Sequence, residues 1–457
     1  MRPDERANGQ ERTAVVLGAG LAGLCAAHEL RRRGVRVVAV IEAQNRIGGR
    51  VQTVRDRLRG DQYAEVGATR ILDSHVHVLD YVREFGLRLR EFQPATKTLF
   101  RIRGRTFTRS AGEPWPTDLF DLAEDERSAD VESLMQRHGP ASAVGNPFCP
   151  RWPTPRELDI DSRPFLEHLR ERQVSDDALL LLRTVSGSAL DSAGTLFWLR
   201  ALMVDDTHDH LYAVHGGNDQ LTDALARGLG DVLRLNSPVL AVDQSTKSAV
   251  VTYRSSGRAH TVTADFVVCA LPPHPMRRIT WGRSLSTEKA EALRTVKMMP
   301  AARCYLQTST RFWTEHGLDG LTLCCTDTPL ERVWDMTHVQ DGNEGLLLAY
   351  MEQDNALAFS HVPHAQRLSY VREQLSTVLP DVERHLVGGF HKSWHEDPWA
   401  GGGWTHVEAG QMATVLPAVR HREGRVLFCG EHTSPWGGWM QGALESAHRV
   451  VRELLSS

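Results

Sequence analysis

The segment TAVVLGAGLAGLCAAHELRRRGVRVVAVIEA, residues 13–43, constrains the fold more than any other part of the chain. It predicts a strand over 13–17, a glycine-rich turn, a helix that ends near Gly34, and a second strand over 35–41. Both strands are continuous apolar runs rather than alternating ones, which indicates a parallel sheet covered on both faces. The segment therefore predicts an α/β fold.

The turn has the sequence Gly18-Ala19-Gly20-Leu21-Ala22-Gly23, a GxGxxG pattern. Gly18 permits the tight turn, Gly20 lets the backbone approach a pyrophosphate, and Gly23 allows the helix to lie close to the strand. The free N–H groups and positive dipole of the helix start favour an anion. Glu42 ends the second strand, where a carboxylate can bind ribose hydroxyls and would repel a 2′-phosphate. A dinucleotide site that excludes NADP is predicted.

The next segment distinguishes between the remaining dinucleotides. Arg46-Ile47-Gly48-Gly49-Arg50 places a glycine pair between two arginines. Such a pair lets the backbone wrap over a second nucleotide phosphate, whose charge the Arg50 guanidinium can neutralise. The alternative is an ordinary arginine-rich turn, which leaves its coupling to Glu42 unexplained. FAD is therefore favoured over NAD.

Composition restricts the class of protein and its surroundings. The 457 residues carry 53 basic and 57 acidic side chains, a formal net charge of −4, so nothing in the charge balance points to nucleic acid. Seven cysteines form no CxxC pair, which favours buried thiols in a reducing compartment over disulfides. The polar start lacks an apolar leader and no run reaches membrane-spanning length, so a cytoplasmic protein is expected.

The chain is longer than one hydrophobic core usually organises, so several units are expected. The predicted class is α/β, with a Rossmann-like FAD-binding domain, a substrate domain built on a mixed sheet, and a helical insertion. The predicted boundaries are a disordered tail over 1–12, a discontinuous FAD-binding domain over 13–90, 205–290 and 385–457, a mostly helical insertion over 91–204, and a substrate-binding sheet domain over 291–384.

Two distant segments resemble the FAD-dependent amine oxidase superfamily, which includes monoamine oxidases, polyamine oxidases and L-amino-acid oxidases. The run 14–50 is similar to the first FAD motif of that group, and FCGEHTSPWGGWMQGALESAHRVV, residues 428–451, is similar to the second. The middle segment GGNDQLTDAL, residues 216–225, also fits. The resemblance is weakest over about residues 95–200. It implies a monoamine oxidase-like fold, most like bacterial L-amino-acid oxidases.

The resemblance also assigns residues to the cofactor. It places Glu431 by the ribityl chain or pyrophosphate, N–H groups around Met440 at the flavin O2, and the Val239 backbone on the adenine side. Gly403 stands where monoamine oxidases have the cysteine bonded to flavin, so noncovalent FAD is expected. Gln44 replaces a second arginine found in many members, which weakens one phosphate contact. The implied cofactor residues are Gly18, Gly20, Gly23, Glu42, Arg50, Gly67, Thr69, Val239, Glu431 and Met440.

Carboxylate recognition separates an amino acid from an amine as the substrate. The segment YAEVGATRILDSHVHVLDYVREFGLRL resembles the one that carries the substrate-binding arginine of L-amino-acid oxidases, and Arg70 falls on that arginine. Tyr350 in GLLLAYMEQDNALAF matches their second carboxylate ligand, and the Gly438 carbonyl is an expected acceptor for the amine. A guanidinium offers a planar fork that matches a carboxylate. The alternative for Arg70 is a salt bridge with Glu65 or Asp73.

Two tryptophans and an arginine complete the expected catalytic set. Trp404 and Trp439 match an aromatic pair that flanks the substrate amine in similar oxidases; alternatively, either ring only packs in the core. Many members hold a lysine, bonded to a water near flavin N5, where this chain has Arg303, counted back from Phe312-Trp313. Arg303 could assist reaction with dioxygen, slow it, or anchor substrate, and Lys297 is the alternative in a different register.

These residues predict oxidative deamination of a neutral L-amino acid, aromatic or large and apolar, to the imino and 2-oxo acid, with dioxygen reduced to hydrogen peroxide. Three alternatives stay open: oxidation of an amine that lacks a carboxylate, oxidative decarboxylation to an amide, and a non-oxidase flavoprotein of a biosynthetic pathway. A homodimer is common among similar enzymes. No metal site is expected, because two histidine clusters lack ligand spacing: His208, His210 and His215, and His75 with His77. Of these, His208 or His210 could line the substrate entrance.

Overall fold

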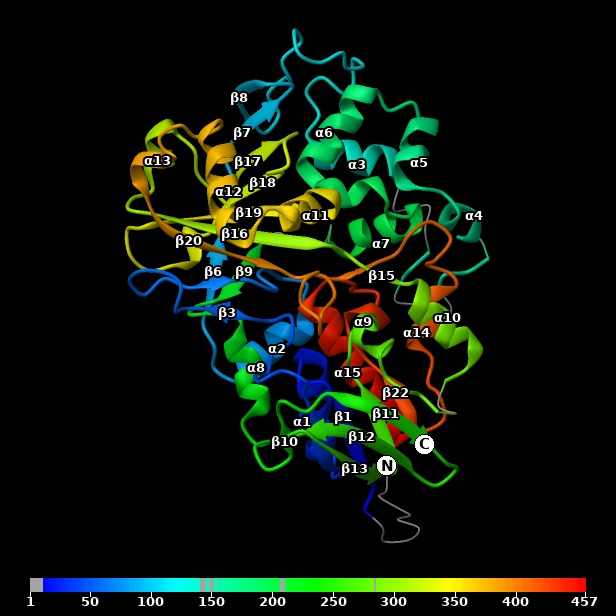
Figure 1. Cartoon of the computed structure of the whole chain (residues 1–457). Coiled ribbons are helices and arrows are strands. Elements are labelled where there is room, and N and C mark those ends of the chain that lie inside the picture. The colour runs from blue at the N-terminus through cyan, green and yellow to red at the C-terminus, as the bar shows by residue number, and fades with distance from the viewer. Residues whose placement is uncertain (1–10, 140–144, 148–151, 156, 206–209, 283–284) are drawn as a thin grey trace.

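A five-stranded parallel sheet organises the lower half of the molecule (Figure 1). The computed structural model describes residues 11–139, 145–147, 152–155, 157–205, 210–282 and 285–457. The strand order is β10-β2-β1-β14-β22, and every neighbouring pair is parallel, as the continuous apolar runs predict. The strands are β1 (Thr13–Leu17), β2 (Arg36–Ile41), β10 (Leu233–Arg234), β14 (Phe266–Cys269) and β22 (Val426–Phe428).

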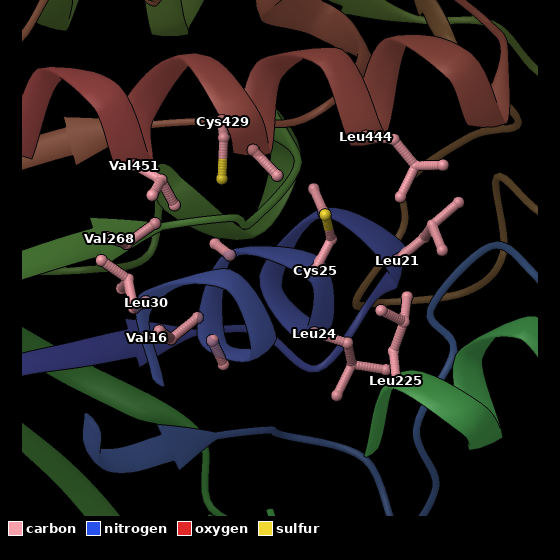
Figure 2. Close-up of a cluster of buried hydrophobic side chains, with 14 of the residues drawn as sticks. Val16, Leu21, Leu24, Cys25, Leu30, Leu225, Val268, Cys429, Leu444 and Val451 are labelled. Atoms are coloured by element: carbon pink, nitrogen blue, oxygen red, sulfur yellow. The ribbon is translucent and has the colours of Figure 1, made fainter. Parts of the chain in front are cut away.

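Helices α1 (Leu21–Arg32) and α15 (Met440–Leu455) pack against each other over one face of this sheet. Figure 2 shows Leu24 of α1 and Leu444 of α15 in one apolar cluster with Val16 of β1. All three side chains are fully buried, and burial of each contributes about 1.5–3 kcal/mol. This contact holds the start of α1 close to the end of β1. Helices α2 (Val76–Glu84) and α8 (Asp219–Ala226) border the same cluster.

The other face of the parallel sheet is covered by a three-stranded antiparallel sheet and short helices. Val15 and Leu17 point to this side because side chains alternate along a strand, and they pack with Val251 and Leu293. The covering elements are β11 (Val239–Gln244), β12 (Ala249–Ser255), β13 (Arg258–Ala264), α9 (Pro273–Met276), α10 (Thr287–Thr295) and α14 (Val415–Arg420).

A seven-stranded sheet forms the second half, with the order β20-β16-β19-β18-β17-β7-β8. Helices α11 (Gln353–His361), α12 (Arg367–Ser376) and α13 (Val382–His385) cover one face (Figure 1). The opposite face carries the aromatic residues that reach the cavity described below. The strands are β7 (Lys97–Ile102), β8 (Arg105–Ser110), β16 (Ala301–Thr308), β17 (Thr322–Thr326), β18 (Arg332–Asp335), β19 (Gly345–Glu352) and β20 (Leu386–Ser393).

Short strands connect the two halves. The sheet β5-β9-β6 consists of Ile71–Leu72, Leu211–Val214 and Leu89–Phe92, and it positions the segment that follows Arg70. The remaining pairs are β3 (Thr53–Val54) with β4 (Ala64–Glu65), and β15 (Lys297–Met298) with β21 (Thr405–His406).

Five helices form a unit at the upper right of Figure 1, and they share an apolar cluster with β7 and β17 of the large sheet, through residues such as Phe100 and Cys325. Phe165, Leu182 and Leu196 are fully buried in this cluster. Among the described residues, no helix has both the length and the apolar character required to cross a bilayer. The helices are α3 (Val131–His138), α4 (Leu158–Asp161), α5 (Phe165–Glu171), α6 (Asp176–Ser186) and α7 (Thr195–Asp205).

Sheet pairing shifts two of the expected boundaries. Residues 97–110 form β7 and β8 of the large sheet rather than the start of a helical insertion, because β7 pairs in parallel with β17. Residues 386–393 form β20 of the same sheet, although they fall within 385–457. Most of the expected tail lies outside the described residues, but the Arg12 guanidinium donates to the Leu454 and Leu455 carbonyls at the end of α15.

Candidate active site

One cavity extends from the glycine turn after β1 to the large sheet. Its lining includes Gly18, Glu42 and Arg50 at one end and Arg303 and Tyr350 at the other. Fourteen of the sixteen residues that the sequence predicts for cofactor and substrate line it. They are Gly18, Gly20, Glu42, Arg50, Gly67, Thr69, Arg70, Arg303, Tyr350, Trp404, Glu431, Gly438, Trp439 and Met440.

The glycine turn has the geometry that its sequence predicts. Gly18 has φ +94°, a conformation that residues with a Cβ rarely adopt. A Cβ at Gly23 would overlap the Gly18 carbonyl oxygen, so only glycine lets α1 approach this closely. Glu42 is buried and accepts hydrogen bonds from the backbone N–H groups of Ala19 (2.8 Å) and Gln44 (2.9 Å). Burial raises its pKa, and these bonds oppose the shift.

Two helices begin at the cavity without any side-chain cap. The first turns of α1 and α15 contain no acidic residue, and within the described part of the chain no N-cap side chain accepts from their first N–H groups. Leu21 and Ala22 of α1 and Met440 and Ala443 of α15 line the cavity. Exposed N–H groups and the positive end of the helix dipole favour anionic ligands. Together with Gly20 and Glu42, they fit the phosphates, ribose and ring oxygen of a flavin dinucleotide.

The segment after β2 passes directly over the turn. Gly48 bridges Gly20 in parallel, and Gly48 N–H donates to the Ala19 carbonyl (2.8 Å). A Cβ at Gly67 would overlap the Arg50 carbonyl oxygen, so this second crossing also requires glycine. Arg46 lies outside the cavity lining, and its guanidinium donates to the Ile47 (3.1 Å) and Gly49 (2.9 Å) carbonyls. Arg46 therefore supports the turn, and Arg50 is the arginine of the pair that reaches the cavity.

Glu431 joins three cavity-lining segments. One carboxylate oxygen accepts from the Arg50 guanidinium (2.8 Å) and from the N–H (3.2 Å) and hydroxyl (2.9 Å) of Thr405. The other accepts from the Gly438 N–H (2.9 Å). Burial alone would raise the pKa of this carboxyl, but the Arg50 charge and these hydrogen bonds lower it. We therefore infer that Glu431 is ionised and that its hydrogen bonds connect the two turns that carry Trp404 and Trp439.

Val239 and Gly23 lie outside the lining. Gly23 acts through helix packing, whereas Val239 begins β11 and pairs with Tyr253. The Ser237 N–H donates to the Glu42 carbonyl (2.8 Å), so the start of β11 adjoins the Glu42 end of the cavity. The adenine contact of Val239 stays a prediction.

Three side chains on neighbouring strands of the large sheet form a row at the other end of the cavity. Arg303 of β16 and Arg332 of β18 are both paired in register with Tyr350 of β19. Residues opposite each other in a sheet point to the same face. The Arg303 and Arg332 guanidinium carbons lie 5.0 and 5.2 Å from the Tyr350 ring centre, and all three residues line the cavity.

Trp334 lies between Arg70 and Tyr350 and contacts both side chains. The Arg70 guanidinium carbon lies 4.8 Å from the Trp334 ring centre and 5.5 Å from that of Trp439. Burial raises the pKa of the Tyr350 hydroxyl, while the charges of Arg303, Arg332 and Arg70 oppose that shift. A neutral phenol and a guanidinium in one cavity are suitable donors for a carboxylate.

Arg303 occupies the cavity, whereas Lys297 does not. The Arg303 guanidinium donates to the Thr69 hydroxyl (2.5 Å) and to the Glu65 carbonyl (2.6 Å). Lys297 lies on β15 with its ammonium exposed and 2.6 Å from Glu408. Arg303 thus lines the cavity and braces the segment that leads to Arg70, and its role near a flavin stays a prediction.

Both predicted tryptophans line the cavity, but not as a stacked pair. The Trp404 ring centre lies 6.4 Å from that of Tyr350, and a Cβ at Gly438 would contact the Trp404 side chain at 3.7 Å. Trp439 packs edge-on against His75 at 5.0 Å. The rings thus border the substrate end from the turns that Glu431 holds together.

Several lining residues escape sequence reasoning. Arg332 lies opposite Tyr350 in a strand pairing that joins distant residues, and Glu352 shares the face of Tyr350 because it is two residues further along the same strand. The alternation rule alone could have identified Glu352. Other missed residues include Ser186, Phe197, Trp198, Arg200, Trp394 and His406.

His75 and His77 lie at the start of α2, and His210 and His215 flank β9 (Leu211–Val214). The His210 imidazole is 2.6 Å from Glu91, and that of His215 is 2.9 Å from Asp341. His208 lies outside the described residues. The described part of the chain contains no group of three or more histidine, cysteine or acidic residues that could hold a metal ion.

Two buried histidines near the cavity predict acid sensitivity. Burial lowers the pKa of both His406 and His432 to about 4; Glu431 opposes the shift of His432, and nearby positive charges add to it. As the pH falls, these two imidazoles therefore become protonated in the unfolded chain at a higher pH than in the folded protein. Stability is fully present above about pH 6.5 and is lost towards pH 4, by at most about 3 kcal/mol per imidazole.

Urea denaturation of the flavin-bound protein at pH 7.5 and 5.0 would measure this loss. His432→Leu, which cannot titrate, should give a shallower pH dependence. An equal dependence in the variant would mean that other groups cause the acid sensitivity. Neither His432 ring nitrogen has a hydrogen-bond partner in the described part of the protein, so the substitution removes no such bond.

The glycine turn, the two uncapped helix starts and the arginine–tyrosine row, which line one cavity, fit a flavin-dependent oxidoreductase. The chain belongs to the flavin-containing amine oxidoreductase family, whose description matches residues 21–455. This confirms the family predicted from the two FAD motifs.

Similar proteins agree with this assignment. The chain is 30% identical to the flavin-dependent L-tryptophan oxidase RebO of Lentzea aerocolonigenes, over 96% of this chain and 97% of the relative. It is 26% identical to an L-amino-acid oxidase of Protobothrops flavoviridis, over 98% of this chain and 90% of the relative. Putrescine oxidase bound to putrescine has the same fold, with a TM-score of 0.83 at 23% sequence identity. The match covers 98% of this chain and 100% of that one. Cyclohexylamine oxidase from Brevibacterium oxydans has a TM-score of 0.82 at 22% sequence identity, and the match covers 98% of this chain and 100% of that one.

Proposed function

We propose that this protein binds FAD noncovalently and oxidatively deaminates an L-amino acid to the 2-oxo acid and ammonia, with dioxygen reduced to hydrogen peroxide. The observation that carries this proposal is the position of Arg70 and Tyr350. Both line the same cavity as the dinucleotide turn, at the end away from Gly18. A substrate held there by its carboxylate would present its α-carbon to the cofactor end.

The chain supplies binding, orientation and exclusion of water. Arg70 and Tyr350 would donate to the two carboxylate oxygens, and the Gly438 carbonyl would accept from the neutral amine. Trp404 and Trp439 would restrict the amine and shield the reacting carbon from solvent. When bound, FAD supplies the two-electron acceptor for the Cα–H hydride. The imino acid formed is hydrolysed by water.

The residue at position 403 supports the proposal of noncovalent attachment. Gly403 lines the cavity and has no side chain that could form a bond to a flavin. The Arg50 guanidinium donates to its carbonyl (3.1 Å). Cavity contacts must therefore hold the cofactor, and acid precipitation should release all of the flavin.

Turnover should separate an amino acid from an amine. The assay is peroxide release with each of the twenty L-amino acids and with the corresponding decarboxylated amines, followed by product analysis. Large aromatic or apolar amino acids are expected to react, because Phe197, Ala201 and Leu202 line the cavity. Reaction of amines alone would contradict the proposal, and an amide product would indicate oxidative decarboxylation.

Arg303 provides a further test of the oxidase step. Its buried charge faces a cavity where reduced flavin would gain negative charge, and charge stabilisation of that kind is commonly worth about 10²–10³-fold in rate. Arg303→Met is therefore expected to slow reoxidation by dioxygen at least about tenfold, and Arg303→Lys much less. Stopped-flow mixing of reduced enzyme with oxygen measures this. An unchanged rate would restrict Arg303 to bracing Thr69.

A further inference from the structure

A buried ion pair in the cavity wall is not used by the proposed reaction. Arg332 of β18 and Glu352 of β19 both line the cavity, and their side chains are 10% and 5% exposed. Arg332 Nη2 lies 2.8 Å from Glu352 Oε1, and Arg332 Nη1 donates to the Ser186 carbonyl (2.8 Å). The pair thus joins the large sheet to the end of α6.

Glu352 is incompletely hydrogen-bonded. Its Oε2 atom is buried and has no hydrogen-bond partner of normal geometry in the part of the chain that the structure describes. Burial raises the pKa of this carboxyl, and the charge of Arg332 and the backbone N–H of Ala189 oppose that shift. Neighbouring Glu331 differs, because its carboxylate accepts from Ser188, Asn355 and the Glu352 N–H. A buried acceptor without a donor costs about 1–3 kcal/mol, which a ligand that brings a donor would recover.

The glycine next to this oxygen leaves room for the ion pair. Gly187 has φ +93°, and a Cβ there would lie 2.5 Å from Glu352 Oε2 and would also overlap Arg332 Nη2. A larger residue would therefore displace the ion pair. Ser186 and Ala189, on either side of this turn, line the cavity.

Charges around the pair restrict the group that could occupy this place. A cationic side chain would meet Arg332, with Arg303 on the other side of the Tyr350 ring. An anionic one would meet the Glu352 carboxylate. A purely apolar one would leave Oε2 unpaired. A neutral aromatic group with one N–H or O–H satisfies the oxygen and packs on apolar residues such as Phe197.

We propose that Glu352, held by Arg332, accepts a hydrogen bond from the N–H or O–H of the substrate's aromatic side chain, and so selects indole or phenol over phenyl. This inference rests on the proposed amino-acid oxidation and names the substrate class of the same site. Glu352 is a specificity-determining residue in this view, and Arg332 is a positioning residue.

Isosteric substrates test the proposal on the unmodified enzyme. The probes are L-tryptophan, L-tyrosine, L-phenylalanine and 3-(benzothiophen-3-yl)-L-alanine, in which sulfur replaces the indole N–H with little change of shape. We expect kcat/KM for L-tryptophan to exceed that for the benzothiophene by about 10- to 100-fold, as for a lost bond to a charged acceptor. We expect L-tyrosine to exceed L-phenylalanine similarly.

Variants identify the acceptor. The double substitution Arg332→Met with Glu352→Leu removes both charges together, so neither is left buried alone, and it should bring the tryptophan-to-benzothiophene ratio close to one. Asp354→Asn, an exposed carboxylate two residues further on, is the matched control and should leave the ratio unchanged. A merely structural ion pair would alter stability or overall rate without changing this ratio.

The outcomes separate the two proposals. Equal kcat/KM for tryptophan and its benzothiophene analogue, with both oxidised, overturns the role of Glu352 and leaves amino-acid oxidation intact. A ratio that persists in the double variant also overturns it. Flavin reduction by amines but by no amino acid overturns both proposals. If the double variant does not fold, the ratio in the unmodified enzyme still decides.

Discussion

Replacing Arg70 with alanine is expected to lower kcat/KM for an L-amino acid by about 30- to 5,000-fold, which corresponds to about 2–5 kcal/mol. The guanidinium lies against Trp334 and Trp439 inside the cavity, so its loss leaves the substrate carboxylate desolvated beside a single neutral donor, Tyr350. Arg70→Lys should recover only part of the activity, because an ammonium cannot reproduce the planar fork. Steady-state peroxide assays provide the measurement.

A comparison of substrates shows whether this loss reflects carboxylate binding. The decarboxylated amine of the preferred amino acid should react with Arg70→Ala no worse than with the unmodified enzyme. Arg258→Ala, on the exposed strand β13, is the matched control for loss of an arginine. If amine and amino acid lose activity equally, Arg70 has a structural role and the amino-acid assignment fails.

Gly23→Ala is expected to prevent stable flavin binding. The added Cβ would overlap the Gly18 carbonyl oxygen and lie 3.1 Å from the Ala270 Cβ, so α1 must move away from the turn. Overpacking of this kind costs about 1–3 kcal/mol or more, equivalent to at least about fivefold weaker binding if the turn is displaced. The ratio of flavin to protein after purification, together with the thermal unfolding temperature, measures the effect.

Gly230→Ala provides the control for this substitution. A Cβ at Gly230 would meet no atom within 4 Å, and its backbone conformation is open to other residues. That variant should retain full flavin occupancy. Full occupancy in Gly23→Ala as well would show that the close approach of α1 to the turn is not required for the cofactor.

The dinucleotide half was accessible from sequence because its signals are local. The bounds predicted around Gly18 depend on apolar runs and glycine spacing within residues 13–50, and the observed β1, α1 and β2 agree with them. Arg303 also lines the cavity, and resemblance had supplied its register relative to Phe312-Trp313; its role stays a prediction. In each case the decisive residues are neighbours along the chain.

The substrate wall was less accessible because strand pairing creates it. Arg332 and Tyr350 lie eighteen positions apart and become neighbours only through the antiparallel register of β18 and β19. β7 joins the large sheet by pairing with β17 across more than two hundred residues, so its segment was assigned to the helical insertion. Hydrophobic periodicity reports which face of a strand is buried, but not which strand lies beside it.

The bonds of Glu431 have a consequence for engineering. One carboxylate accepts hydrogen bonds from Arg50, Thr405 and Gly438. Glu431 therefore fixes the two turns that carry Trp404 and Trp439 to the loop that crosses the glycine turn. Libraries that randomise residues around either tryptophan should therefore yield many variants that purify without bound flavin and are colourless. Broader substrate scope is better sought at β18 and the α6 end, which Glu431 does not touch.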